Sequence, residues 1–315
     1  MNRCVATSVI ATSLAAVLLI SAPLISASAI QQESPPRFRT GVDLVSLTVT
    51  VTNKKQQYVA GLAREDFLIF EDGVKQQMTF FSNRKTPIAL AILLDTSASM
   101  EEKLHTAQQA ASGFVEHLGP DDLGSVIEFN NRVAVSQTFT DDRAALTRAI
   151  RQTRANGPTS LHNAVYVALK ELRKTTAGSA EQIRRQAIVV LSDGEDTASL
   201  IGFEEVLDLA KRSDVAIYAI GLQDRETGPR TGFNEADFVL RQFTRETGGR
   251  AFFPKAVAEL PAIYQQIARE LASQYVLGYA SSNPRRDGGW RRVVVQMRRQ
   301  DAAARTKLGY YGPTQ

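Results

Sequence analysis

The chain has 315 residues, enough for one α/β domain of about 200 residues plus a small companion. With 43% hydrophobic and 22% charged residues, the composition is that of a globular protein and excludes collagen, coiled coil and extended disorder. The formal net charge of +4 is too small to indicate nucleic acid as a partner.

The first 29 residues predict a secretory signal. Arg3 supplies a positive start, residues 5–25 are apolar, and Ala27-Ser28-Ala29 fits a signal-peptidase site. An uncleaved membrane anchor is the alternative, since the apolar run is nearly long enough to span a bilayer. No later segment reaches that length, so we expect an exported protein that is periplasmic, on the cell surface or secreted. After signal cleavage it is not expected to be an integral membrane protein.

Residues 30–39 are predicted to form a linker and residues 40–85 an antiparallel β segment. The linker stretch is polar and contains prolines. From Val45 to Val51, apolar residues alternate with serine and threonine, which is typical of a half-buried strand. Strands are expected at residues 45–51, 58–59, 67–70 and 78–81.

Residues 86–272 have the pattern of repeated βαβ units, in which apolar runs of strand length alternate with amphipathic stretches of helical length. Strands are expected at 88–94, 123–129, 132–139, 187–191, 215–222 and 250–253, and helices at 101–118, 143–154, 160–174, 203–212, 235–246 and 260–272. Asn130-Asn131 predicts a tight turn, which would place an antiparallel strand at the edge of the sheet. The fold class is therefore α/β, a doubly wound Rossmann-like domain with a mostly parallel six-stranded sheet.

Residues 273–315 return to β character. Strands are expected at 275–279, 292–297 and 307–311, joined by the connections 283–289 and 301–305. The strands on either side of the α/β domain are too few to bury a stable sheet alone. We therefore expect both ends of the chain to pair into one small antiparallel β-sandwich in which the α/β domain is inserted. The four arginines around Gly288-Gly289 are interpreted as solvated charges that flank a hairpin turn, namely Arg285, Arg286, Arg291 and Arg292.

Two carboxylates follow buried strands of the predicted sheet. Asp95 comes directly after the strand 88–94, and Asp193 directly after residues 188–192. In a doubly wound sheet, ligands bind beyond the carboxyl ends of the strands, where the strand order reverses. Two carboxylates at that edge repel each other unless a proton or a cation lies between them.

The residues after Asp95 favour a cation. Ser97 and Ser99 alternate with it along a loop, so one carboxylate and two hydroxyls can face one point. Oxygen ligands without histidine or cysteine suit magnesium, manganese or calcium. The alternative is that Ser97 or Ser99 caps the following helix and that Asp193 is a turn residue before Gly194.

This arrangement resembles the metal-ion-dependent adhesion site of von Willebrand factor type A domains, in which an Asp-x-Ser-x-Ser loop is joined by a distant threonine and a distant aspartate. Gly157-Pro158-Thr159 stands where that family usually has Gly-Gly-Thr, and residues 191–194 match its Asp-Gly loop. The resemblance implies one divalent cation, Mg²⁺ in the first place with Mn²⁺ or Ca²⁺ as alternatives. Its ligands, direct or through water, would be Asp95, Ser97, Ser99, Thr159 and Asp193. Pro158 departs from the family's glycine and puts the tilt of Thr159 in doubt.

The similarity covers the whole mature chain. The segments 62–73 and 308–311 are similar to a von Willebrand A-related family known chiefly from acidobacterial genomes. That family implies the fold and the site but names no substrate. In such a site the cation keeps one coordination position open for an acidic group. We therefore expect a binding protein whose partner is a protein or another ligand that bears a carboxylate.

Two other functions remain open at this point. A magnesium-dependent phosphatase-like hydrolase would use Asp95 as its nucleophile, although such enzymes usually place a second aspartate where this chain has Ser97. A metal-stabilised envelope scaffold would make its contacts through the β-sandwich. The histidines are expected in surface or core roles rather than catalysis, namely His105, His117 and His162. Residues 224–234 are expected near the same sheet edge, where they would shape specificity.

Overall fold

The computed structural model describes residues 44–177, 184–193, 195–222 and 235–314. The predicted signal and linker, and the loop 224–234, lie outside the described residues. Within the part that is described, no helix combines the length and the apolar character needed to cross a membrane.

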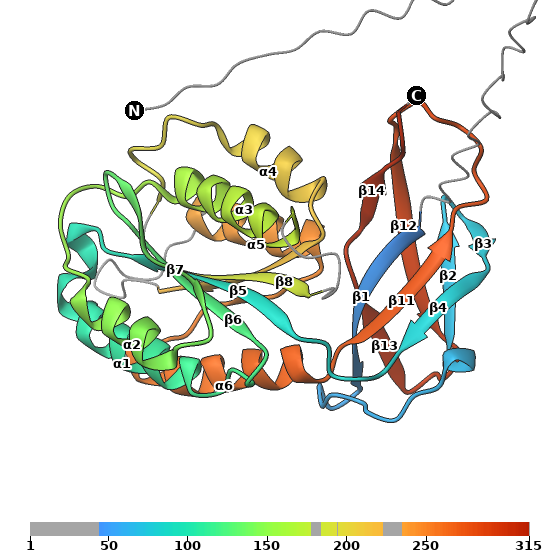
Figure 1. Cartoon of the computed structure of the whole chain (residues 1–315), viewed down its shortest axis with the longest axis horizontal. Helices are drawn as coiled ribbons and strands as arrows, with labels where there is room; N and C mark the ends of the chain where they lie inside the picture. The colour runs from blue at the N-terminus through green and yellow to red at the C-terminus, as the bar shows by residue number, and fades with distance from the viewer. Residues whose placement is uncertain (1–43, 178–183, 194, 223–234, 315) are drawn as a thin grey trace, which may run out of the picture. The chain divides into compact units, whose positions relative to one another are not determined.

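A six-stranded sheet forms the centre of the α/β domain (Figure 1). Its strands are β5 (Ile88–Asp95), β6 (Leu123–Phe129), β7 (Val133–Thr140), β8 (Arg185–Ser192), β9 (Val215–Gly221) and β10 (Ala251–Phe252). The order is β10-β9-β8-β5-β6-β7, and every neighbouring pair is parallel except β6 and β7. The prediction of a mostly parallel sheet with an antiparallel hairpin at its edge is confirmed.

Helices cover both faces of this sheet. They are α1 (Glu101–Val115), α2 (Arg143–Gln152), α3 (Leu161–Ala177), α4 (Phe203–Lys211), α5 (Glu235–Thr247) and α6 (Leu260–Ala272). One face packs on α1, α2 and α6, and the other on α3, α4 and α5 (Figure 1). Short 3-10 turns precede α1 at Ala98–Met100 and α6 at Val257–Glu259.

The central strand β5 is buried on both faces, which explains its continuous apolar sequence. Successive side chains of a strand point to opposite faces. Leu90 and Ile92 accordingly pack in the core under α1 and α6, whereas Ala91 and Leu93 pack in the core under α3. This double burial fixes the position of Asp95, the last residue of the strand.

Both ends of the chain form a β-sandwich of two four-stranded sheets, as predicted. Its strands are β1 (Leu44–Asn53), β2 (Phe67–Glu71), β3 (Val74–Gln76), β4 (Met78–Ser82), β11 (Tyr275–Ala280), β12 (Trp290–Met297), β13 (Ala302–Arg305) and β14 (Gly309–Tyr311), and a 3-10 turn lies at Arg64–Asp66. The orders are β13-β1-β11-β4 and β14-β12-β2-β3, so each sheet mixes strands from both ends. One apolar core fills the space between them.

Several predicted strands of the sandwich were wrong in detail. Residues 58–59 contribute only the isolated bridge of Tyr58 to Thr52. Residues 302–305, expected as a connection, form β13 and pair with β1. The strand β3 was not predicted at all. Ala302-Ala303-Ala304 carries no alternating pattern, so only its partner strand decides that this segment becomes a strand.

The arginines near Gly288 also differ from the prediction. Arg291 is 3% exposed rather than solvated, and its Nη1 lies 3.5 Å from Oε1 of the buried Glu71. A charge tolerates such burial when it is paired and hydrogen-bonded. The connection 283–289 joins strands of different sheets, so it is not a hairpin turn.

A buried carboxylate on α6 links the α/β domain to the sandwich. Glu270 is fully buried and accepts hydrogen bonds from the Tyr218 hydroxyl at 2.7 Å and the Thr50 hydroxyl at 3.2 Å. It also accepts from Tyr58 at 3.1 Å and pairs with Arg305. Because these partners come from both the α/β domain and the sandwich, the network fixes the C-terminal end of α6 against the sandwich.

Candidate metal centre

The structure places Asp95 and Asp193 at neighbouring strand ends. Asp95 ends β5, and Asp193 follows Ser192, the last residue of the adjacent strand β8. The chain passes from β5 to β6 on one side and returns to β8 on the other, so the strand order reverses at this point. This is the edge at which doubly wound sheets bind their ligands.

The carboxylate of Asp95 is completely buried. Its Oδ1 accepts a hydrogen bond from the Ser97 amide at 2.9 Å, and its Oδ2 accepts one from the Ser192 hydroxyl at 2.5 Å. Burial raises the pKa of Asp95, while these hydrogen bonds lower it and the charge of Asp193 raises it further. No basic side chain of the described residues forms an ion pair with Asp95. A buried carboxylate of this kind fits a position beside a bound cation.

Hydroxyl groups connect the loop after β5 to Asp193. The Ser97 and Ser99 hydroxyl oxygens lie 3.0 Å apart, and the Ser99 hydroxyl donates to Oδ1 of Asp193 at 2.8 Å. The other oxygen of Asp193, Oδ2, accepts from Lys103 Nζ at 2.6 Å. Four of the five predicted ligands therefore lie in one group of oxygens at the sheet edge.

These contacts contradict the helix-capping alternative for the two serines. Ser97 precedes the 3-10 turn 98–100, but its side chain makes no capping hydrogen bond. The helix α1 starts after Met100, again without a side-chain cap. Asp193 is more than a turn residue, because its carboxylate binds both Ser99 and Lys103.

Thr159, the fifth predicted ligand, belongs to a loop that is hydrogen-bonded to the loop after β5. The Ala98 amide donates to the Gly157 carbonyl at 2.8 Å, and the Asn156 amide donates to the Thr96 carbonyl at 2.7 Å. Thr159 is 5% exposed, and its carbonyl accepts from the amide of Thr197 at 2.9 Å. Its backbone is thus held beside the site, although among the described contacts its hydroxyl has no hydrogen bond to the other four ligands.

The first turn of α3 is capped by other residues than Thr159. The His162 amide donates to Oδ2 of Asp196 at 2.7 Å, and the Asn163 amide donates to the Ser199 hydroxyl at 3.0 Å. The start of α3 is therefore capped from the loop after β8. This loop consequently fixes both Asp193 and the start of α3.

Sequence reasoning missed two residues of the site. Lys103 follows Ser99 by four residues, a helical spacing that places both near one face of the chain. Ser192 precedes Asp193, and its hydroxyl holds Asp95. Of the histidines, His105 and His117 are exposed and His162 is half-buried beside Phe203.

The donor set suits a hard cation. It consists of two carboxylates and three hydroxyls, all of them oxygen ligands. Within the described ranges, no three His, Cys, Asp or Glu side chains lie close enough together to hold a metal. A cation at this edge would therefore depend on the serine and threonine hydroxyls as well as on Asp95 and Asp193, and the residues present fit that requirement.

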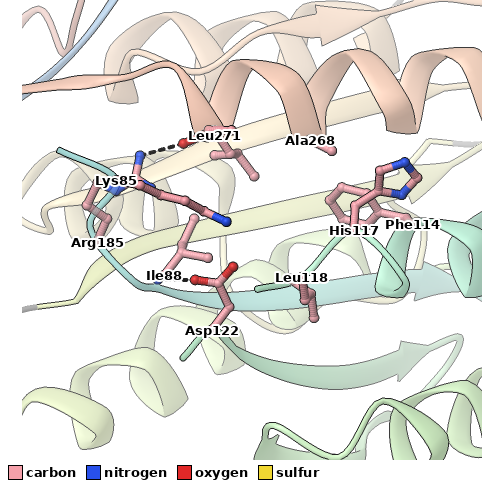
Figure 2. Close-up of a pocket in the computed structure, with 10 residues that line it drawn as sticks. Lys85, Ile88, Phe114, His117, Leu118, Asp122, Arg185, Ala268 and Leu271 are labelled. Atoms are coloured by element: carbon pink, nitrogen blue, oxygen red, sulfur yellow. Dashed lines mark hydrogen bonds between the residues drawn. The ribbon is translucent and has the colours of Figure 1, made fainter. Parts of the chain in front are cut away.

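A small pocket near the amino end of β5 does not resemble a binding site. Its volume is about 30 Å³, which is the space of about one water molecule. Figure 2 shows Asp122, whose carboxylate accepts a hydrogen bond from the Ile88 amide at 2.9 Å. It also shows Arg185, which donates a hydrogen bond to the Leu271 carbonyl at 2.7 Å. These charged side chains fasten the start of the strand to its neighbours.

The fold places this protein in the Rossmann-like class of doubly wound α/β proteins. The family model described as von Willebrand factor type A domain matches residues 89–266, more than half of the chain. The chain therefore belongs to the von Willebrand factor type A domain family.

Comparison with single proteins gives relatives whose names state no activity. A stretch of 117 residues is 31% identical to an uncharacterized protein of Synechocystis and covers 36% of this chain and 27% of that protein. A UPF0353 protein of Nocardia farcinica is 25% identical over 63% of this chain and 67% of its own length. The chain thus spans about a quarter of the first relative and about two thirds of the second.

A solved structure shares the fold. It is described as von Willebrand factor type A from Catenulispora acidiphila, with a TM-score of 0.51 and 12% sequence identity. The similarity covers 88% of this chain and 76% of that one. At this identity the likeness concerns the fold alone.

Proposed function

We propose that this protein is an exported binding module that captures a carboxylate-bearing partner through a divalent cation at the carboxyl edge of its sheet. The observation that carries the proposal is the group of oxygens formed by Ser97, Ser99 and Asp193 beside the buried carboxylate of Asp95. Export rests on the sequence of residues 1–29.

The chain's own residues determine how the cation would be held. Ser97, Ser99 and Thr159 would offer neutral hydroxyls, and Asp95 and Asp193 would act directly or through water. When bound, Mg²⁺ supplies a Lewis-acid position that accepts an oxygen of an acidic side chain. Backbone hydrogen bonds hold the loop after β5 independently of a cation. The Thr96 amide donates to the Phe129 carbonyl at 2.8 Å, and the Thr96 carbonyl accepts from the Asn156 amide.

The loop that follows Asp193 is hydrogen-bonded to α3. Leu200 is 95% exposed on the loop that follows Asp193. Its amide donates to the Asn163 side chain at 3.2 Å, and the neighbouring Ser199 hydroxyl donates to Asp196 at 2.6 Å. The loop therefore presents Leu200 to solvent from a backbone that is hydrogen-bonded to α3.

Calorimetry with magnesium and manganese tests the metal site. We expect binding of one ion by the wild type and none by Asp95→Ala. The matched control is Asp121→Ala, which removes an exposed carboxylate next to the start of β6, at the opposite end of the strands. Equal binding by wild type and Asp95→Ala would refute the site.

A capture experiment then tests the function. The purified protein is incubated with envelope extract in magnesium, and EDTA is added to the captured material. Release of the partner by EDTA supports a metal-bridged contact, whereas a partner that stays bound would favour the scaffold. Hydrolysis of a generic phosphate ester that is lost in Asp95→Asn would replace binding by catalysis.

A further inference from the structure

A second pocket lies along the open edge of the six-stranded sheet. Its volume is about 740 Å³. The strand β10 ends the sheet order, so its outer edge pairs with no other described strand. The pocket lies there, between α5 on one side and β1 and β13 of the sandwich on the other. The strand β9 separates β10 from β8, so this site is distinct from the group around Asp95.

The described residues that line the pocket include four arginines and no acidic residue. Arg241 and Arg245 lie one turn apart on α5, and Arg250 precedes β10. The fourth, Arg305, pairs with the buried Glu270 and so is already neutralised. The other three form no ion pair with a carboxylate among the described residues. The described lining thus includes three arginines without an ion-paired carboxylate, and this favours an anionic ligand.

Two of these guanidinium groups are held by aromatic rings. Arg241 lies 4.1 Å from the centroid of the Phe253 ring, and Arg250 lies 5.2 Å from that of Phe252. Stacking of this kind restricts a guanidinium while its N–H groups stay available at the edge. Such fixed donors match the geometry of carboxylate and phosphate oxygens.

The rest of the lining combines polar side chains, such as Gln56 and Gln242, with apolar ones. Phe238 shares a face of α5 with Arg241 and Arg245 and is 38% exposed, and the opposite wall carries Ala303 and Leu308. The volume lies within the range of about 300–1,000 Å³ that is typical of small-molecule sites. We propose that this pocket binds an amphipathic anion, a small molecule with a carboxylate or phosphate head on an apolar body. The proposal is independent of the metal site.

Fluorescence titration of the full chain with 1-anilinonaphthalene-8-sulfonate, an anionic aromatic probe, tests this in EDTA. Dodecanoate and dodecyl phosphate serve as competitors below their micelle-forming concentrations, and dodecanol is the neutral comparison. The variant Arg241→Ser/Arg245→Ser removes two of the positive charges. Its matched control, Arg148→Ser/Arg151→Ser, removes two exposed charges from α2.

We expect one of the two anions to displace the probe. The Kd of that anion should rise by roughly tenfold for each arginine that the pocket variant removes. The control variant should match the wild type, and dodecanol should compete poorly. The stronger competitor identifies the head group as carboxylate or phosphate. A second variant, Ala303→Trp, replaces an exposed lining residue of β13, fills the pocket and should abolish displacement while all arginines stay. Failure of both anions to compete, equal Kd values in the pocket variant and the wild type, or equal competition by dodecanol would each overturn the proposal.

Discussion

Lys103 is the side chain whose removal should change metal binding most informatively. Its Nζ lies 2.6 Å from Oδ2 of Asp193, whose side chain is fully buried. The ammonium therefore occupies one oxygen of a proposed ligand and adds a positive charge beside the proposed cation. We predict that Lys103→Met tightens Mg²⁺ binding ten- to a hundredfold.

The magnitude follows from the charges. Two unit charges 4 Å apart interact by about 4 kcal/mol at an effective dielectric constant of about 20. The repulsion of a divalent ion is larger, but the flexible lysine stem can move the ammonium outward when the ion binds. We expect about 1.4–2.8 kcal/mol to remain, which corresponds to ten- to a hundredfold in Kd.

The same substitution should have the opposite effect on the metal-free protein. Asp193 loses a charged hydrogen-bond donor while it stays buried, so the free energy of unfolding in EDTA should fall by about 1–3 kcal/mol. Calorimetric titration with Mg²⁺ and urea unfolding in EDTA measure the two effects. Lys103→Arg keeps the charge and should bind Mg²⁺ like the wild type, and Lys174→Met removes a 70% exposed charge as a control. An unchanged or weaker Mg²⁺ affinity in Lys103→Met would refute the reasoning.

Two further predictions concern the network that joins the domains. Glu270→Leu should lower the free energy of unfolding, measured by urea unfolding, by about 3–5 kcal/mol, because Arg305 and the Tyr218 hydroxyl lose their buried partner. A loss below about 1 kcal/mol, the size of an ordinary substitution, would contradict this. Burial, followed by the charge of Glu270, raises the pKa of Tyr58 from 10.0 to about 12. The stabilisation linked to this shift is complete below pH 10 and is lost as the pH rises toward 12, so Tyr58→Phe should flatten the fall of the unfolding free energy across that interval in urea titrations at successive pH values. An equally steep fall in the variant would count against it.

The class of fold was readable from the sequence because its signals are local. The run from Ile88 to Leu94 is apolar throughout, as expected for a strand that is covered on both faces. The amphipathic stretches between such runs have helical spacing, which predicts the helices. The turn at Asn130-Asn131 likewise predicted the antiparallel pair β6 and β7. Ala302–Arg305 has no alternating pattern and gave no such signal, so β13 was missed.

The sequence by itself determined that Asp95 and Asp193 lie at one edge of the sheet, because both follow buried strands and parallel strands end together. Only the tertiary structure decided what surrounds them. Contacts between residues far apart in the chain brought Lys103 to Asp193 and buried Arg291 against Glu71. Charges of this kind look solvated in a sequence, since nothing local in it records the distant partner that compensates their burial.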